Sequence, residues 1–214
     1  MLLVALVSLM LVGPTLEGTP AAVVLPATWM CVLAGSVLMV SEKRVSFVLS
    51  LVMGIPLLLV LLYDTAMGMP QGDAVLSWIQ LLFVGHVAVE MFAMTIRQGT
   101  VDFQKLAAAF SVYLLMGIIW AIGYELVEAH LPGSLVGPEG RALERSDYAY
   151  FSFVTLTTLG YGDIQPVSSL ARMLAVLEAS AGVLYVAVLV SRLVASYGDE
   201  LRRPQRRGAH GDTN

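Results

Sequence analysis

The chain reads Thr-Thr-Leu-Gly-Tyr-Gly-Asp at residues 157–163, between two long apolar stretches. A short glycine-rich loop at membrane depth is permitted only where protein buries it or where it lines a water-filled passage, because lipid cannot hydrogen bond to its peptide groups. Gly160 and Gly162 can adopt positive φ values that other residues resist, so successive carbonyl groups can face one side of the loop. The stretch therefore predicts a row of backbone oxygen atoms able to replace the hydration shell of a cation.

The other residues of the loop suit this arrangement. Thr158 can add a hydroxyl oxygen at the inner end of the row, and Tyr161 can point away from the axis and brace the loop through its ring and hydroxyl. A tight glycine turn between two helices is the alternative interpretation of the same letters.

A short aromatic run precedes the loop. Ser146 or Asp147 is the predicted N-cap, and an acidic residue suits a helix start. The run contains Tyr148, Tyr150, Phe151 and Phe153. A dozen helical residues reach only about halfway across a 30 Å hydrocarbon core. The predicted half-helix aims its partly negative C-terminus at the bilayer centre, where a cation would otherwise be poorly solvated.

Residues 158–163 resemble the selectivity filter of the tetrameric potassium channel family, prokaryotic type, and the half-helix then corresponds to the pore helix. Leu159 stands where the family most often carries Val or Ile, and Val154 replaces an acid that is frequent there. The resemblance implies K⁺ binding through Thr158, Leu159, Gly160 and Tyr161, with Gly162 completing the filter. It also implies support from Thr157 and Asp163, and no other cofactor.

Composition places the whole chain in the membrane. Hydrophobic residues make up 57% and charged residues 13%, and the mean hydropathy is +0.79; a soluble domain does not carry that balance. Apolar segments cover about 1–13, 21–40, 45–63, 74–95, 104–127 and 168–197. The first is either a retained helix, extending through Leu16, or a cleaved signal without the usual basic start.

These segments predict an all-α membrane protein with six transmembrane helices, a re-entrant pore helix and an extended filter. Because the chain has one filter segment, four copies must meet around the ion path as a homotetramer. Residues 1–100 form a predicted four-helix domain, residues 101–198 the pore domain, and residues 199–214 a short basic tail.

Lys and Arg predict the orientation. With both termini cytoplasmic, the inner loops hold eight basic residues: Lys43, Arg44, Arg97, Lys105, Arg202, Arg203, Arg206 and Arg207. The outer loops are more acidic, which is the positive-inside pattern. Segment 74–95 contains no Lys or Arg, so no steep voltage dependence is expected. The absence of eukaryotic targeting signals favours a bacterial plasma membrane.

Small and apolar residues recur along the last segment. Gly182 is either a gating hinge, as its spacing from the filter resembles that of the family, or a close-packing position against the pore helix. By the same resemblance, the cavity-lining candidates are Val186, Val190, Ser191 and Val194; lipid-facing or core residues would show the same pattern.

Several ionisable residues fall at membrane depth, which raises a functional hypothesis by default. His86 and Glu90 share a helix face and form either a pH sensor or an interhelical hydrogen-bonded pair. Glu125 and Glu178 lie on the two pore-domain helices. Glu178 either tunes the filter from behind or is neutral and bonded to nearby backbone.

The predicted function is passive, potassium-selective conduction. The expected partners are K⁺, membrane lipids and further copies of the chain, with no nucleic acid. No catalytic constellation is visible, so an enzyme is not expected. The alternatives are a subunit of a potassium transporter and a less selective cation channel.

Overall fold

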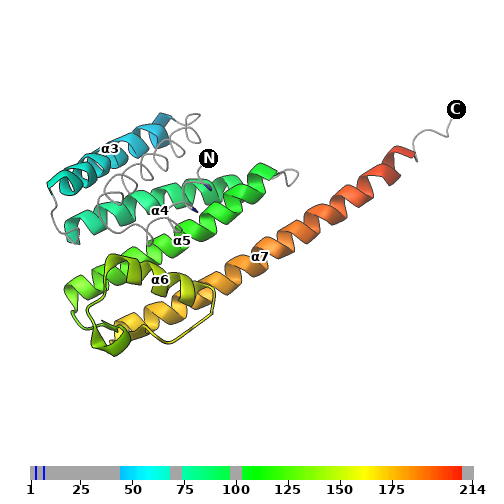
Figure 1. The fold of residues 1–214 in the computed structure, drawn as a ribbon. Coiled ribbons are helices and arrows are strands. Elements are labelled where there is room, and N and C mark those ends of the chain that lie inside the picture. The colour runs from blue at the N-terminus through cyan, green and yellow to red at the C-terminus, as the bar shows by residue number, and fades with distance from the viewer. Residues whose placement is uncertain (1–2, 4–6, 8–43, 68–73, 97–102, 209–214) are drawn as a thin grey trace.

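Helices make up most of the described structure, as lipid requires of a chain whose peptide groups must bond within each segment. The computed structural model describes residues 3, 7, 44–67, 74–96 and 103–208 (Figure 1). The elements are α3 (Arg44–Met67), α4 (Ala74–Ile96), α5 (Phe103–His130), β1 (Leu135–Val136), η2 (Pro138–Gly140), α6 (Arg145–Leu156), β2 (Gln165–Pro166) and α7 (Ser169–Gly208).

Three of the described helices are long and apolar enough to cross a membrane. These stretches are Ala74–Ala93 in α4, Lys105–His130 in α5 and Ser169–Arg192 in α7. The described apolar stretch of α3, Val48–Leu59, is shorter. The predicted segments 1–13 and 21–40 lie outside the described residues, apart from Leu3 and Val7, and so does the predicted domain boundary near residue 100.

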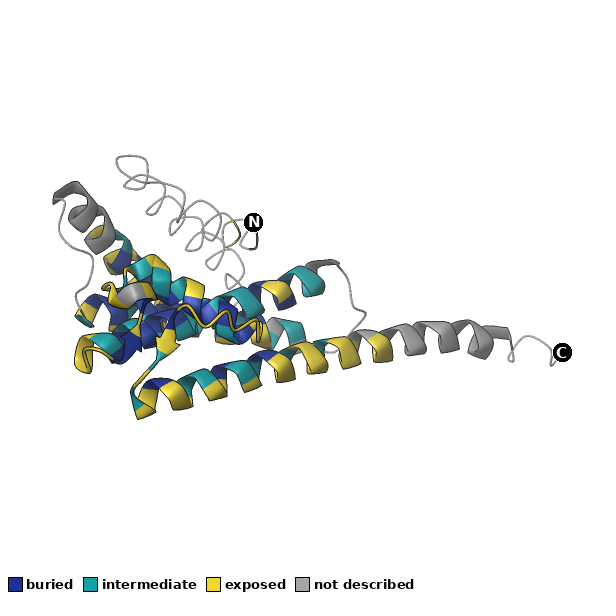
Figure 2. Ribbon diagram, turned by 60° about the horizontal axis from the view of Figure 1, so that its bottom comes forward, coloured by how far each residue is buried: buried dark blue, intermediate teal, exposed yellow. Residues whose placement is uncertain are grey.

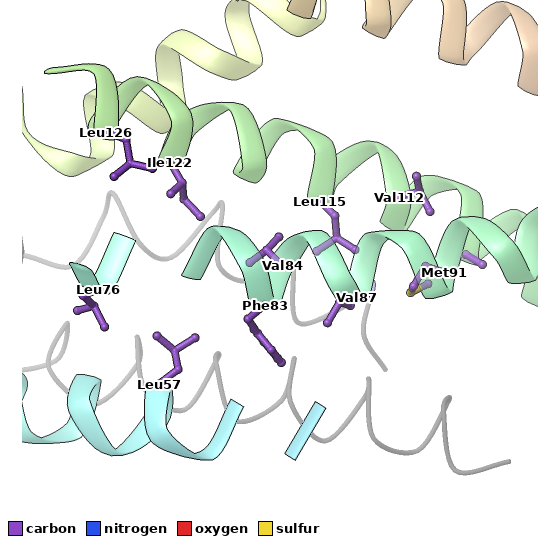
Figure 3. Packing of buried hydrophobic residues seen from close by; sticks show 11 residues of the cluster. Leu57, Leu76, Phe83, Val84, Val87, Met91, Val112, Leu115, Ile122 and Leu126 are labelled. Carbon is purple, nitrogen blue, oxygen red and sulfur yellow. The ribbon is translucent and has the colours of Figure 1, made fainter. Parts of the chain in front are cut away.

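An apolar core joins α3, α4 and α5 (Figure 3). Leu57 of α3 faces Leu76 and Phe83 of α4, while Leu115 and Ile122 of α5 lie against the other side of α4. The remaining buried members are Val84, Val87, Met91, Ala108, Val112 and Leu126. Helix α4 is therefore the layer between α3 and the second half of the chain.

Helix α6 lies between α5 and α7 and has 12 residues, about 18 Å of helix. Its length and position agree with the predicted half-helix. The predicted N-cap at Ser146 or Asp147 is wrong, because Glu144 is the N-cap and Asp147 is the third helical residue. Asp147 accepts a hydrogen bond from the Glu144 amide nitrogen at 2.7 Å, so the acid stabilises the helix start from inside the first turn.

A two-stranded antiparallel sheet departs from the purely helical prediction. Strand β1 pairs with β2 in the register Leu135 to Pro166 and Val136 to Gln165. The sheet connects the segment after α5 with the segment after the 157–163 loop. Both strands have two residues, which is too short to give a sequence signal.

Helix α7 extends beyond the predicted end of the pore domain at residue 198. It continues to Gly208 and runs past the other described helices (Figure 1). Its side chains are exposed along most of the described length, in contrast to those of α4 and α5 (Figure 2). The predicted tail is thus helical as far as Gly208, and residues 209–214 lie outside the described part of the chain.

Candidate functional site

In the 157–163 loop, the backbone angle φ is positive at every second residue from Thr158 to Gly162. Thr158, Gly160 and Gly162 have φ values of 58°, 60° and 78°, while Leu159 and Tyr161 do not have positive φ. Glycine accepts this conformation without penalty, whereas Thr158 holds it at a cost of about 1–3 kcal/mol. Peptide planes that turn at every second residue bring carbonyl groups to one side of a strand, where an ordinary strand would alternate them.

Hydrogen bonds hold the inner end of this loop against α6. The amide nitrogens of Leu159 and Gly160 both donate to the carbonyl oxygen of Val154, at 2.9 and 3.3 Å. The Thr158 amide donates to the Thr155 carbonyl oxygen at 2.9 Å. With the amides turned toward the helix end, the carbonyl oxygens of residues 158–161 accept no hydrogen bond from the described residues. They remain available as ligands.

The outer end of the loop is held by Asp163. The Tyr150 hydroxyl donates to Asp163 Oδ2 at 2.8 Å, and the Ile164 amide donates to Oδ1 at 3.1 Å. Gln165 Nε2 donates to the Gly162 carbonyl oxygen at 2.8 Å. Tyr150 lies one helical turn before Val154, so a residue of α6 holds Asp163 although Val154 has no acid to offer.

A buried carboxyl group joins α5, α6 and α7. Glu178 of α7 is fully buried. It accepts hydrogen bonds from the Tyr124 hydroxyl of α5 at 2.7 Å and lies 2.5 Å from the Ser152 hydroxyl of α6. The Ser152 hydroxyl is also 2.7 Å from the Gly117 carbonyl oxygen. We refer to these four residues as the Glu178 cluster.

The distances within the Glu178 cluster indicate which oxygen atoms carry protons. The Ser152 hydroxyl has one proton to donate, and two acceptor oxygens lie within reach. All contacts can be hydrogen bonds at once only if Glu178 carries a proton and donates it to Ser152, which then donates to Gly117. A neutral carboxyl also suits a site without solvent access, because burying an unpaired charge is costly.

Gly182 lies one turn after Glu178, where α7 meets the end of α6. A Cβ atom at this position would overlap the carbonyl oxygen of Leu156. Gly117 of α5 is similar, because a Cβ atom there would overlap the ring of Phe153. Gly182 therefore occupies a close-packing position against α6, which is one of its two predicted roles, and the hinge role stays a prediction.

The predicted cavity-lining residues all lie on α7 and are exposed in the single chain. Val186, Val190 and Val194 are 46%, 52% and 67% exposed, on one helix face. Ser191 is exposed too, and its hydroxyl donates to the Ala187 carbonyl oxygen at 2.8 Å.

His86 and Glu90 lie on α4. The His86 ring nitrogen Nε2 is 3.1 Å from the Ser50 hydroxyl of α3, so His86 joins two helices of the N-terminal half. Glu90 is half-buried. The contact to Ser50 shows one interhelical hydrogen bond, while a pH-sensing pair stays a prediction.

Two arginines organise the start of α6. Arg141 forms a two-point contact with Asp147, at 2.7 and 2.6 Å, and this hydrogen-bonded pair lowers the pKa of Asp147 below its ordinary value of 3.8. Arg145 contacts Gln80 of α4 and lies 3.4 Å from Glu125 of α5. Glu125 thus has a basic partner that its place in the sequence does not indicate.

The described residues combine three helices that are long and apolar enough to cross a membrane with a half-length helix and a loop whose carbonyl oxygens accept no hydrogen bond at residues 158–161. Residues 109–197 match the family model described as ion channel. Residues 109–197 are therefore similar in sequence to ion-channel domains.

The chain is also similar in sequence to parts of three known proteins. The chain is 34% identical to two pore potassium channel b of Oryza sativa subsp. japonica over 44% of this chain and 24% of that protein. It is 32% identical to inward rectifier potassium channel Kirbac3.1 of Paramagnetospirillum magnetotacticum over 40% of this chain and 27% of that protein. It is 43% identical to two-pore potassium channel 4 of Arabidopsis thaliana over 23% of this chain and 17% of that protein. These matches span about a quarter or less of the relatives' length, and no solved structure gives a significant match.

Proposed function

We propose that four copies of this chain form a potassium-selective pore, with K⁺ bound by the carbonyl oxygens of Thr158, Leu159, Gly160 and Tyr161. The observation that carries the proposal is the alternating backbone of the 157–163 loop, with φ positive at every second residue and amides bonded back to α6. Oxygen atoms freed in this way can replace the hydration shell of a dehydrated cation. The Thr158 hydroxyl adds a ligand at the inner end.

The tetramer follows from the geometry of ligation. One loop supplies oxygen atoms from one side, and a cation needs them from several sides, so a closed ring of copies is required. The exposure of the chain supports this. Only 11% of the apolar stretch of α7 is buried, against 39% in α4 and 44% in α5, and the filter residues are exposed. Neighbouring copies and lipid would cover these surfaces.

The rest of the pore half supports the ion path. Helix α6 ends at Leu156, directly before the filter. Its partly negative C-terminus therefore lies next to the inner end of the filter, where it favours a cation that enters from the cavity. Val186, Val190, Ser191 and Val194 line the cavity below, and an apolar constriction of this kind closes a pore by dewetting.

Orientation and gating complete the proposal. With positive charge inside, both chain ends are cytoplasmic and Asp163 marks the outer mouth, in a plasma membrane. Helix α4 contains no Lys or Arg, so its movement carries no gating charge of the usual kind and voltage dependence is weak.

Flux through purified tetramers in liposomes tests the function. We expect passive K⁺ conduction that greatly exceeds Na⁺ conduction and is abolished by Gly160→Ala, because the left-handed φ excludes a Cβ atom. Slow, saturating uptake would instead indicate a transporter subunit, and equal K⁺ and Na⁺ currents a less selective cation channel. Either result would overturn the proposal.

A further inference from the structure

Arg145, the first residue of α6, contacts helices from both halves of the described chain. Its Nη2 atom donates to Oε1 of Gln80 on α4, and its Nε atom lies 3.4 Å from Oε2 of Glu125 on α5. The two contacts use different nitrogens of one planar guanidinium group. Arginine can hold two partners in fixed directions in this way, whereas the ammonium group of lysine acts as a single point charge.

The contact between Arg145 and Gln80 is important because the Gln80 side chain is buried. This side chain is fully buried in a mostly apolar helix, where an amide costs free energy unless it is hydrogen bonded. Its Nε2 atom has no hydrogen-bond partner among the described residues, so the bond from Arg145 to Oε1 is what offsets its burial. Helix α4 thus has a strong preference for one position relative to Arg145.

We propose that Arg145 is a positioning residue that connects the N-terminal helices to the filter. Helix α6 is a rigid 12-residue element, and the other end of this helix holds the filter amides through the Val154 carbonyl oxygen. A shift of α4 at Gln80 therefore moves α6 and the loop together. The inference rests on the proposed function, since it assigns to the N-terminal half a role in setting the filter.

A second contact supports a connection along the length of α4. Near the other end of that helix, Arg192 Nη1 of α7 donates to the Thr95 carbonyl oxygen at 3.1 Å. Helix α4 thus contacts the pore helix near one end and α7 near the other. Its position affects both of the helices that border the ion path.

Two variants of the full-length chain separate this role from simple packing. Gln80→Leu removes the acceptor on α4, and Arg145→Lys keeps the charge near Glu125 but loses the two-point geometry. We expect each to lower the K⁺ to Na⁺ permeability ratio by about tenfold, the change that corresponds to one lost hydrogen bond to a charged group. The double variant should be no worse than either single one, because both remove the same link.

Ser50→Ala is the matched control, because it breaks the hydrogen bond between α3 and α4 without touching α6. It should leave the permeability ratio within twofold of the parent. An equal loss in Ser50→Ala, or additive losses in the double variant, would overturn the positioning role while leaving the proposed function intact.

Hydrogen exchange provides a readout that does not depend on conduction. Gln80→Leu should speed amide exchange in residues 145–160 at least threefold while the middle of α5 stays unchanged. Unchanged exchange in residues 145–160 would contradict the proposal. Absence of K⁺ flux in the parent protein, together with faster exchange in the variant, would reject the proposed function alone.

Discussion

Helices α3 and α4 pack mainly through apolar side chains, whereas α5, α6 and α7 are also joined by buried hydrogen bonds. In the first region the core consists of residues such as Leu57, Phe83 and Val87. In the second, the Glu178 cluster joins all three helices, and a half-buried hydrogen bond runs from the Tyr185 hydroxyl to the Ala109 carbonyl oxygen at 2.7 Å. Lipid is as apolar as a leucine side chain, so apolar packing alone sets the relative position of membrane helices weakly.

The difference shows which helices must be held in accurate relative positions. Directional hydrogen bonds and close backbone contacts fix α5, α6 and α7 around the loop, and a ligand shell of carbonyl oxygens needs that accuracy. The N-terminal helices have looser requirements, except at directional contacts such as the one between Arg145 and Gln80. Mutations should therefore affect the pore half more strongly than the N-terminal half.

The largest effect is expected at the closest backbone contact. Gly182→Ala introduces a Cβ atom that overlaps the Leu156 carbonyl oxygen, and a backbone atom cannot move aside. We expect a loss of about 3 kcal/mol in stability and of K⁺ flux, because α7 is pushed away from α6. Thermal unfolding in detergent and liposome flux measure both.

Gly123→Ala is the control for that substitution. Gly123 also lies inside a helix, and a Cβ atom there would meet nothing within 4 Å. This variant should be neutral or slightly more stable, since alanine favours helix. Equal damage at both glycines would show that helix flexibility, and not close contact, is what Gly182 provides.

The next effect concerns the carboxyl group of Glu178. Glutamine can accept from Tyr124 and donate to Ser152, as the protonated acid does, so Glu178→Gln should change stability by less than about 1 kcal/mol. Glu178→Leu leaves both hydroxyl groups without this partner and should cost about 2–3 kcal/mol. Thermal unfolding of the two variants, compared with the parent, measures the contrast. If glutamine proves as harmful as leucine, Glu178 is ionised in the folded protein.

A smaller effect is expected at the outer end of the filter. Tyr150→Phe keeps the ring and removes the hydrogen bond to Asp163, at a cost of about 1 kcal/mol. The consequence should appear in function more than in folding, as faster loss of conduction when K⁺ is lowered. Bilayer recordings at stepped K⁺ concentrations measure this. Identical time courses in variant and parent would show that Asp163 is held without Tyr150.

The smallest effect is expected at the start of α6, in the ion pair between Arg141 and Asp147. Because the pKa of Asp147 is lowered by Arg141, the pair contributes stability above the ordinary pKa of the acid and loses it as pH falls through the lowered value. The unfolding temperature should drop below about pH 4, and Asp147→Asn should remove that part of the drop. An unchanged profile in the variant would mean that the pair adds nothing, as many surface pairs do.

Local chemistry made part of this structure predictable. Gly160 and Gly162 have the positive φ that their residue type suggested, and the half-helix spans Arg145–Leu156 as the short aromatic run indicated. The described long helices lie close to the predicted apolar segments. Each of these features depends on neighbours in sequence, or on hydropathy over a few turns.

Contacts between distant residues could not be predicted. Tyr124 and Glu178 are 54 positions apart, and Ser152 and Glu178 are 26 apart. A tyrosine or serine in an apolar helix gives no signal of which carboxyl group it meets. The positive φ of Thr158 was missed for a related reason, because bonds to α6 impose it against the preference of the residue.

Anomalous diffraction from crystals of the full chain soaked in Tl⁺, a heavy substitute for K⁺, tests the central claim most directly. The account predicts a row of peaks on a fourfold axis, each surrounded by carbonyl oxygens of residues 158–161 from four copies. An axis without peaks, or carbonyl groups of this loop bonded to neighbouring protein instead, would contradict it.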